Sequence, residues 1–408
     1  MKKRYTITKE FVFADCLVIP SVYEGVLERF EKFIFPFISH LHARTQQQKA
    51  RDYMKGLLSD TERKNVESIA YFHGQQRQQL QKFIGQSDWD DEVILDKLVK
   101  HIARQIGEQD GVLILAPTSF PKKGKESVGV QRQWCGRLGK TENCQVAIFL
   151  AYASSIEFAL VDRRLYLPQE WIDDKVRCNK AGIPQEHRVM KTRHTQSLEM
   201  INGRGKKLPH KWIAGDDEMG KVPWFRRDLR VQNEPYMFAV PSNILICDLE
   251  TPGEYCKKCG KEFEREFVNV CEWAKNIPTK KWKTIKVRQG HKGWLTIKLV
   301  KCQVRAMIEN EIGDEETLVV SKWHEDNGKP RCDYYLSWNN EQTDLHEYAR
   351  VIKQAYRIEE SFHRAKGECG LADYQVRNWK GWHHHVALNL LTLWFLTEEL
   401  LNQKKAYR

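Results

Sequence analysis

The order of strand and helix signals along the chain is the feature that most restricts its fold. Three short apolar runs follow one another closely, at Val112–Leu115, Gln145–Tyr152 and Phe158–Val161. Two more runs, Trp212–Gly215 and Tyr236–Val240, come after segments with helical periodicity. Closely spaced strands form antiparallel hairpins, whereas helix-separated strands are typical of parallel pairing. The sequence therefore predicts an α/β fold with a mixed sheet.

The local composition divides the chain into four regions. Residues 1–108 have helical periodicity, and residues 109–242 contain the apolar strands. Residues 243–342 hold short β-like segments and a basic run, and helical periodicity returns in residues 343–408. We therefore expect a helical N-terminal domain, an α/β core split by a β-rich basic insertion, and a helical C-terminus.

The N-terminal region contains several helix signals. Tyr23–His40 is amphipathic, Ser59–Glu62 resembles a helix start with acids in its first turn, and Asp90–Ile106 places apolar residues on one side. A Gln-rich stretch at residues 74–82 lies between them. The region is interpreted as a DNA-binding and dimerisation domain or as a purely structural bundle.

The charge balance favours a polyanionic partner. The chain has 66 Lys and Arg against 54 Asp and Glu, a formal net charge of +12. An excess of this kind is typical of nucleic-acid-binding proteins, and a basic enzyme that binds no polyanion is the alternative. The most apolar run, Val386–Leu396, is too short to span a bilayer. The start MKKRYTITKE lacks an apolar segment, and the 11 cysteines are scattered, so we expect a cytoplasmic protein without a membrane partner.

A strongly basic segment lies within the insertion. Thr279–Arg305 reads TKKWKTIKVRQGHKGWLTIKLVKCQVR and contains no acid. Trp282 and Trp294 interleave with its cations, so they either stack on an unpaired base or pack in a small core of the insertion. A second basic loop is expected where the first strand breaks at Pro117. The cations expected to contact DNA are Lys122, Lys123, Lys125, Arg132, Arg137, Lys140, Lys280, Lys281, Lys283 and Arg357.

One carboxylate lies in an otherwise apolar helical stripe. Apolar residues recur at 3-4 spacing along the helix expected from Asp344 to Lys366, and Glu359 and Lys366 lie on that same face. A carboxylate on a core-facing stripe must be ion-paired, protonated or bound to a metal, because its burial alone is costly. A buried ion pair is the structural alternative to a metal ligand at Glu359.

A second acid directly follows an apolar strand. Asp216 continues the strand Trp212–Gly215, although Asp217 remains a rival and a helix-capping role is the alternative. Two carboxylates near basic loops indicate metal-assisted phosphoryl transfer, since carboxylate oxygens suit Mg²⁺ and two such ions can act on both the attacking and leaving oxygens. Such a site normally needs a third carboxylate. The neighbouring strand would supply it, but that strand ends at Ala116.

Several motifs resemble those of one family. The block SFPKKGKESVGVQRQWCGRLGK, the segments LVDRRLYLP and GDDEMG, and the late RIEESFHRAKGECGLADYQVRNWKGWHHH are similar to bacterial insertion-sequence transposases. The group they most resemble is numbered seven-oh-one, within the DDE transposases of RNase H-like fold. The resemblance covers nearly the whole chain. It implies a β-rich insertion before the helix that carries the third acid, which matches residues 243–342.

The resemblance also implies roles for individual residues. The second and third acids fall on Asp216 and Glu359, and the first acid position is occupied by Ala116. Lys366 matches the lysine that follows the third acid by seven positions in a related signature. It further implies two Mg²⁺ ions, with Mn²⁺ as a substitute, and double-stranded DNA partners, namely transposon ends and target DNA. We expect a bacterial homodimer that associates with the nucleoid when bound. A non-catalytic DNA-binding protein derived from a transposase is the alternative, and Ala116 is its main support.

Three weaker signals lead to separate expectations. Cys256 and Cys259 could bind zinc together with Cys271, although a clear fourth ligand is missing. The run His383–His385 is expected to contact solvent or DNA at the start of a helix, because successive helical residues cannot easily share one metal. Asp162 is expected to pair with a neighbouring arginine, on a strand that runs antiparallel to the first one.

DNA binding by this chain is predicted to weaken steeply with salt, whether or not the chain is catalytic. Each phosphate neutralised by a Lys or Arg adds about 0.9 to the log–log slope of affinity against salt. Binding measured across a salt series should therefore fall by about tenfold or more between low and moderate ionic strength. A flat response would contradict the assignment of the basic segments to a DNA surface.

Overall fold

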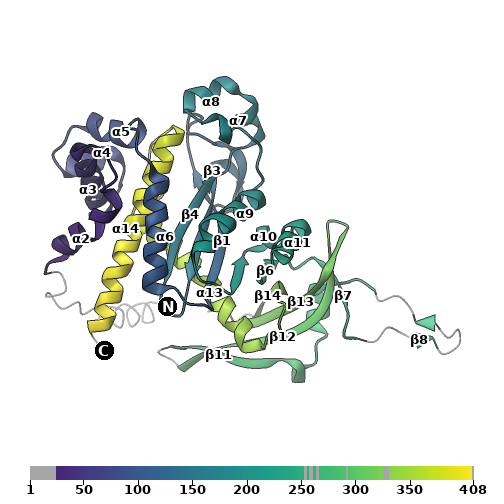
Figure 1. The fold of residues 1–408 in the computed structure, drawn as a ribbon. Coiled ribbons are helices and arrows are strands. Elements are labelled where there is room, and N and C mark those ends of the chain that lie inside the picture. The colour runs from purple at the N-terminus through teal and green to yellow at the C-terminus, as the bar shows by residue number, and fades with distance from the viewer. Residues whose placement is uncertain are drawn as a thin grey trace, which may run out of the picture.

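The structure is a computed structural model that describes residues 24–251, 255–256, 261–262, 266–290, 293–324 and 330–406. It contains one large mixed sheet, with helices packed against its faces and a helical region at one side (Figure 1). The expected α/β class is confirmed. None of the helices in these ranges is long and apolar enough to cross a membrane.

The N-terminal region is helical over its described part. Its helices are α2 (Val26–Ile38), α3 (Arg44–Leu58), α4 (Val66–Phe72), α5 (Arg77–Gly85) and α6 (Asp91–Ile106). Helix α6 starts after Asp90, whose side chain accepts a hydrogen bond from the Glu92 amide, and it buries the apolar side expected from the sequence.

The helix start expected at Ser59–Glu62 is wrong. Ser59 instead ends α3, because its hydroxyl donates to the Gly56 carbonyl at 2.7 Å. Helix α4 begins seven residues later, after Asn65, whose side chain accepts from the amides of Glu67 and Ser68. The acids of the expected first turn therefore lie in a loop, and an asparagine provides the cap.

Five strands form the core of the sheet, in the order β4-β3-β1-β5-β6. They are β1 (Val112–Pro121), β3 (Lys140–Ala153), β4 (Phe158–Leu165), β5 (Trp212–Gly215) and β6 (Tyr236–Val240). Strand β3 is antiparallel to β1 and to β4, and β5 is parallel to β1 and β6. This is the strand order and direction of an RNase H-like fold. Strand β4 therefore runs parallel to β1, and the expectation that it opposes β1 is wrong.

Strand β1 is longer than the sequence suggested. It does not break at Pro117, which pairs with Ile148, and it continues to Pro121. The Lys122 amide donates to the Asn143 carbonyl at 2.9 Å, which places Pro117 at a non-hydrogen-bonded position of the β1–β3 ladder. On the other edge, β5 pairs only as far as Leu115. Since neither neighbour needs an amide from residue 117, the proline is tolerated within the strand.

Most strands of the insertion extend the core sheet. Strand β14 pairs antiparallel with β6, and the order continues through β13, β12, β7 and β10, with β11 paired to β12. The strands are β7 (Leu245–Asp248), β10 (Val268–Asn269), β11 (Lys283–Gly290), β12 (Gly293–Ile308), β13 (Glu311–His324) and β14 (Pro330–Trp338). A short helix, α12 (Val270–Lys275), covers a second hydrophobic cluster, and β8 (Tyr255–Cys256) pairs with β9 (Lys261–Glu262).

The remaining helices pack around this sheet. They are α7 (Gln169–Asp173), α8 (Lys175–Ala181), α9 (Arg193–Gly203), α10 (Asp217–Gly220), α11 (Pro223–Val231), α13 (Leu345–Gly367) and α14 (Trp379–Ala406). Helix α13 packs along β1, β3, β4 and β5, and α14 lies beside α6 in Figure 1 and contacts α3, α5 and β4. Asp344 caps α13 at the expected residue.

The run His383–His385 lies in the core, so the expectation of solvent or DNA contact is wrong. His384 is 1% exposed, stacks on Trp89 and bonds through its two ring nitrogens to the carbonyls of Ile84 and Trp89. His385 is fully buried and bonds to the Tyr53 hydroxyl at 2.9 Å. Burial lowers the pKa of His385 to about 3. These histidines connect α14 to the N-terminal helices.

A buried ion pair joins the insertion to the core. The Arg226 guanidinium on α11 donates to both carboxylate oxygens of Glu316 on β13, at 2.8 and 3.0 Å. The Tyr236 hydroxyl donates to the same carboxylate at 2.7 Å. Arg226 and Glu316 are 2% and 3% exposed. Removal of one partner would leave a buried charge uncompensated.

Arg226→Ala is predicted to lower the free energy of unfolding by about 3–5 kcal/mol, because Glu316 would remain buried without its counter-ion. Arg227→Ala is the matched control, since Arg227 pairs with Glu311 and Asp314 at the surface. It should cost about 0–1 kcal/mol. Urea unfolding of the two variants measures the difference, and equal losses would show that the pair does not hold the insertion to the core.

A candidate active site at the ends of β1 and β5

Ala116 and Asp216 each follow the last residue through which β1 and β5 pair with one another. The register pairs Leu115 of β1 with Gly215 of β5, and Ala116 and Asp216 are the next residues along the chain. Adjacent strands are about 5 Å apart, so the two positions are neighbours at the carboxyl edge of the sheet. Gly215 permits this pairing, because a Cβ there would lie 3.1 Å from the Leu115 carbonyl oxygen and from the Phe238 ring. Ala116 itself is 8% exposed.

Asp216 is both a helix cap and a perturbed carboxylate. Its side chain accepts a hydrogen bond from the Met219 amide at 3.3 Å, at the start of α10. The carboxylate is open to solvent on one side. The protein packed around it and the nearby Glu218 carboxylate raise the pKa of Asp216 to about 7. The capping role that the sequence allowed is therefore present, together with a shift of the kind found at functional sites.

Helix α13 brings Glu359 toward the same place. Phe362, one turn beyond Glu359, packs edge-on against Phe149 with ring centroids 5.3 Å apart. Phe149 is the cross-strand partner of Ala116, so the two side chains share a face of the sheet. Because Glu359 and Phe362 lie on one side of the helix, this contact places Glu359 above the Ala116 face.

Lys366 provides a second anchor between α13 and β1. Its ammonium group donates to the Thr118 hydroxyl at 2.7 Å, and Thr118 lies two residues beyond Ala116 on the same strand face. Burial chiefly, with the Arg137 charge in addition, lowers the pKa of Lys366 to about 8. The structure thus brings Ala116, Asp216, Glu359 and Lys366 to one edge of the sheet.

Glu359 is exposed, so the interpretation of a carboxylate buried in a core-facing stripe is wrong for this residue. The stripe itself is real near the start of α13, where Tyr348 and Ile352 are buried. The helix contacts the sheet again beyond Glu359, through Phe362 and Lys366, so the opening is local. The Glu359 side chain is exposed there, where a cation or DNA can reach it.

Most of the cations expected to bind DNA lie in two exposed groups, and Lys122 and Arg357 belong to neither. Lys123, Lys125, Arg132, Arg137 and Lys140 are exposed beyond the end of β1. The partly buried Lys122 lies 3.5 Å from the centroid of the Tyr374 ring, and burial lowers its pKa to about 8. Lys280, Lys281 and Lys283 are exposed on the insertion. Arg357 does not join either exposed group, because it pairs with Glu157 at 2.9 Å and donates to the Ser154 carbonyl.

The two insertion tryptophans have different outcomes. Trp282 is partly buried against the second hydrophobic cluster, with the Lys322 ammonium 5.8 Å from its ring centroid. This position agrees with the interpretation of a core residue. The side chains of Trp294 and Cys256, and the whole of Cys259, lie outside the described part of the structure. The expected zinc site falls there as well.

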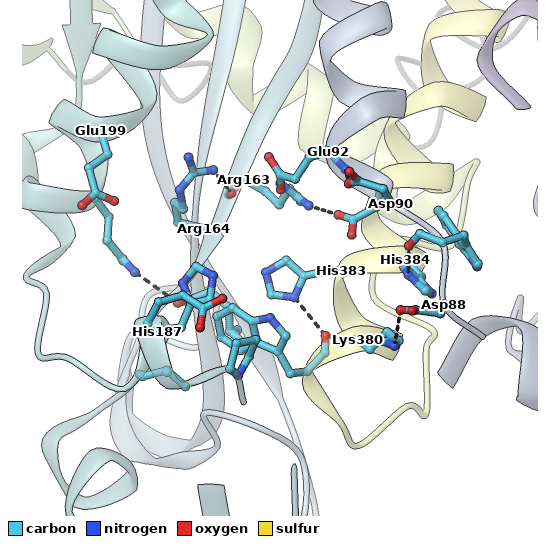
Figure 2. Close-up of a pocket in the computed structure, with 18 of the residues that line it drawn as sticks. Asp88, Asp90, Glu92, Arg163, Arg164, His187, Glu199, Lys380, His383 and His384 are labelled. Atoms are coloured by element: carbon cyan, nitrogen blue, oxygen red, sulfur yellow. Dashed lines mark hydrogen bonds and ion pairs between the residues drawn. The ribbon is translucent and has the colours of Figure 1, made fainter. Parts of the chain in front are cut away.

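A separate pocket lies away from this edge. A pocket of about 750 Å³ lies between the N-terminal helices, the end of β4 and the start of α14 (Figure 2), and none of the candidate site residues lines it. Arg163 in its wall pairs with Asp91 and Glu92, and Lys380 pairs with Asp88 at 2.9 Å. These ion pairs hold the N-terminal helices to the core.

Asp162 belongs to the structural network behind this pocket. Its carboxylate is fully buried and accepts from Arg204 at 2.7 Å and from Arg164 at 3.0 Å. The expected pairing with an arginine is correct, although the strand direction used to predict it was not. Arg204 is the partner that sequence reasoning missed, because no local pattern links residues 42 positions apart.

The contacts that position α13 were also missing from the sequence analysis. Thr118 and Phe149 carry no chemistry by themselves, and the sequence gives no signal that they receive Lys366 and Phe362.

Sequence comparison identifies the family, which the geometry alone does not. A family model described as DDE superfamily endonuclease matches residues 36–294, more than half of the chain. The RNase H-like sheet is the architecture of a nuclease core, and the chain belongs to the DDE superfamily endonucleases.

Two individual proteins are also similar to this chain. The chain is 36% identical over 94 residues to the probable transposase for insertion sequence element IS701 from Microchaete diplosiphon. That match covers 23% of this chain and 25% of the relative, so it spans a quarter of the relative's length. A piggyBac transposase in a synaptic complex with hairpin DNA aligns over 93% of this chain and 74% of its own, with 9% identity and a TM-score of 0.44.

The residues at this edge are of the type that binds a divalent cation, but one carboxylate fewer is present than such a site normally has. Asp216 and Glu359 offer the carboxylate oxygens that Mg²⁺ prefers, whereas Ala116 offers none. No cluster of three or more His, Cys, Asp or Glu side chains poised for a metal occurs among the residues that the structure describes. The raised pKa of Asp216 suits a carboxylate whose charge a cation would stabilise.

Asp216→Asn is predicted to stabilise the fold at pH 8 but not at pH 4. The folded-state pKa of Asp216 is raised to about 7, so the folded protein holds a proton there that the unfolded chain has released. The free energy of unfolding therefore falls as pH rises from about 4 to 7, and Asn removes that loss. Thermal melting at both pH values, without divalent cations, measures it. An equal gain from Asp217→Asn would assign the effect to net charge.

Proposed function

We propose that this chain is an insertion-sequence transposase of the IS701 type. It binds double-stranded DNA at the inverted-repeat ends of its element and belongs to a reaction of metal-dependent cleavage followed by strand transfer into target DNA. With Ala116 in place of the first acid, the chain as written binds DNA without cleaving it. Membership of the DDE endonucleases and the partial match to an IS701 transposase support this proposal.

The observation that carries this proposal is the meeting of three distant segments of the chain at one edge of the sheet. Position 116 and Asp216 follow the last paired residues of two neighbouring parallel strands, and the Phe362–Phe149 and Lys366–Thr118 contacts support a position of Glu359 on the same side. These segments are separated by about a hundred residues or more in the chain. Their meeting at one solvent-open edge, next to exposed cations, is what a DNA-cleaving site requires.

Each residue has a distinct task in the proposed site. Asp216 and Glu359 would hold divalent cations through their carboxylate oxygens. Mg²⁺, or Mn²⁺ in its place, would stabilise the charge that develops on the attacking and leaving oxygens when bound. The Lys366 ammonium, held by Thr118, lies ready to contact a phosphate of the DNA strand. The exposed cations beyond β1 and on the insertion fix the duplex through its backbone.

The methyl group of Ala116 is the reason for the proposed inactivity. An acid at this position would add a further carboxylate ligand next to Asp216. Without it, the cations and the reacting phosphate are poorly held, and loss of several kcal/mol of transition-state stabilisation is on the order of a thousandfold in rate or more.

A non-catalytic DNA-binding protein derived from a transposase is the second candidate, and Ala116 is the observation that favours it. The state of the other positions favours the transposase. Lys366 retains its anchor on Thr118, and Asp216 retains its perturbed environment at the end of β5. A homodimer is proposed on the same basis, since each element end must be held while both are joined.

Ala116→Asp is predicted to restore Mg²⁺- or Mn²⁺-dependent cleavage at the end of a cognate inverted repeat, because it supplies the missing carboxylate beside Asp216. Gel analysis of end-labelled DNA, with the alanine form alongside, measures the rate. The gain should be about a thousandfold or more.

Two substitutions in the restored protein provide the controls. Glu359→Gln should abolish the restored cleavage, whereas Glu360→Gln, on the next residue of the same exposed helix surface, should change it little. If Ala116→Asp binds verified ends but stays inert with both metals, the non-catalytic protein is the correct reading. Efficient cleavage by the alanine form would show that the proposed set of acids is wrong.

A further inference from the structure

Trp134 is exposed in a way that core packing does not explain. Its side chain is 57% accessible, and Trp224, at 38%, is the other tryptophan among the exposed large hydrophobic residues of the described chain. Trp134 lies on β2 (Gln131–Cys135), which forms a hairpin with the start of β3. Burying such a ring contributes a large apolar area, so its exposure on a regular strand indicates a binding role.

The hairpin is rigid, so Trp134 has a defined position. Its other face is packed, because Cys135, Cys144 and Val146 are buried together against Tyr166. The turn is fixed to β1 as well, since the Arg137 amide and the Cys135 thiol both donate to the Ser119 hydroxyl, at 3.2 and 3.3 Å. Ser119 lies three residues beyond Ala116, so the hairpin projects from the same edge as the candidate active site.

Cations lie on the same face of the hairpin as the exposed ring and in the loop bonded to that face. Arg132 lies on the same strand face as Trp134 and is exposed. Its cross-strand partner Asn143 donates to the carbonyls of Lys122 and Gly124, which ties the basic loop to this face of the hairpin. Lys123 and Lys125 in that loop are exposed. The nearby acid Glu142 is already paired with Lys140 at 3.4 Å.

We propose that the Trp134 face of this hairpin is a stacking platform for an unpaired DNA base next to the cleavage site, with Arg132, Lys123 and Lys125 on the phosphates of that strand. The inference rests on the proposed function and assigns the strand form that the site takes. An aromatic ring between cations is the arrangement that binds single strands irrespective of sequence.

The arrangement favours an unpaired strand over two other occupants. The interior of a duplex hides the faces of its bases, so phosphate contacts alone would leave the ring unused. A protein partner would need a broader apolar surface, whereas the other exposed apolar side chain of the turn is Leu138, at 45%. The basic surroundings complement a polyanion.

The test compares two DNAs with the full chain at one low salt concentration. One is a blunt duplex that ends in the element terminus, and the other is the same duplex with a short run of unpaired thymidines on either strand. The unaltered chain should bind the extended DNA more tightly. Trp134→Ala should lower that affinity on the order of tenfold, as loss of one stacked base implies, and leave the blunt duplex nearly unchanged.

Two variants separate stacking from other effects. Trp134→Phe keeps an aromatic face and should retain most of the preference for the extended DNA. Leu138→Ala removes apolar surface from the same hairpin and should retain all of it. Melting temperatures of the three variants should match that of the unaltered chain, since these side chains are exposed.

Three outcomes would overturn the inference. If Trp134→Ala weakens both DNAs equally, or neither, the ring does not stack on an unpaired base, and the proposed function is unaffected. If Trp134→Ala instead changes the mass of the protein in solution, measured by light scattering, while the DNA preference stays, the face is a protein interface. If the unaltered chain binds neither DNA, the proposed function fails together with the inference.

Discussion

The parallel pairing of β1 with β5 determines where the rest of the candidate site lies. Gly215 allows the strands to approach, because any side chain there would meet the Leu115 carbonyl and the Phe238 ring at 3.1 Å. The pairing ends one residue before Ala116 and Asp216, so Asp216 leaves the sheet beside Ala116, which stays paired with Phe149 of β3. Gly220 has a related effect one turn later, since a Cβ there would collide with the Ala239 carbonyl as α10 packs on β6. Small residues thus fix the direction in which Asp216 leaves its strand.

Helix α13 completes this arrangement from a distant part of the chain. The insertion lies between β6 and α13 in sequence, yet its strands continue the core sheet, and its β11–β12 hairpin packs on α13. The insertion is therefore joined to the core through the sheet itself. At the other side, α14 and its buried histidines join the N-terminal helices to the core. The helix that carries Glu359 is held by its sheet contacts on β1 and β3.

The sequence was sufficient wherever one local pattern determines the structure. The bounds of β5 and β6, the Asp344 cap of α13 and the strand-end position of Asp216 follow from periodicity and capping. The sequence was not sufficient where the structure depends on contacts with residues distant in the chain. Pro117 sits within a strand because neither neighbouring strand needs its amide. The histidine run is buried because α14 packs on the N-terminal region, where the His384 ring nitrogens lie against the carbonyls of Ile84 and Trp89. Glu359 shares a stripe with buried residues but is itself exposed, although Phe362 and Lys366 farther along the helix contact the sheet, and no local pattern reports where such an opening lies.

The central claim is that positions 116, 216 and 359 form one cation site, and cleavage of the backbone by bound iron tests it directly. Fe²⁺ replaces Mg²⁺ in the Ala116→Asp protein, and ascorbate with peroxide generates radicals that cut the chain within a few ångströms of the metal. The account predicts fragments that end near all three positions, which are suppressed by excess Mg²⁺ and reduced in the alanine form. Cuts confined to one segment, or cuts elsewhere that Mg²⁺ suppresses, would contradict it.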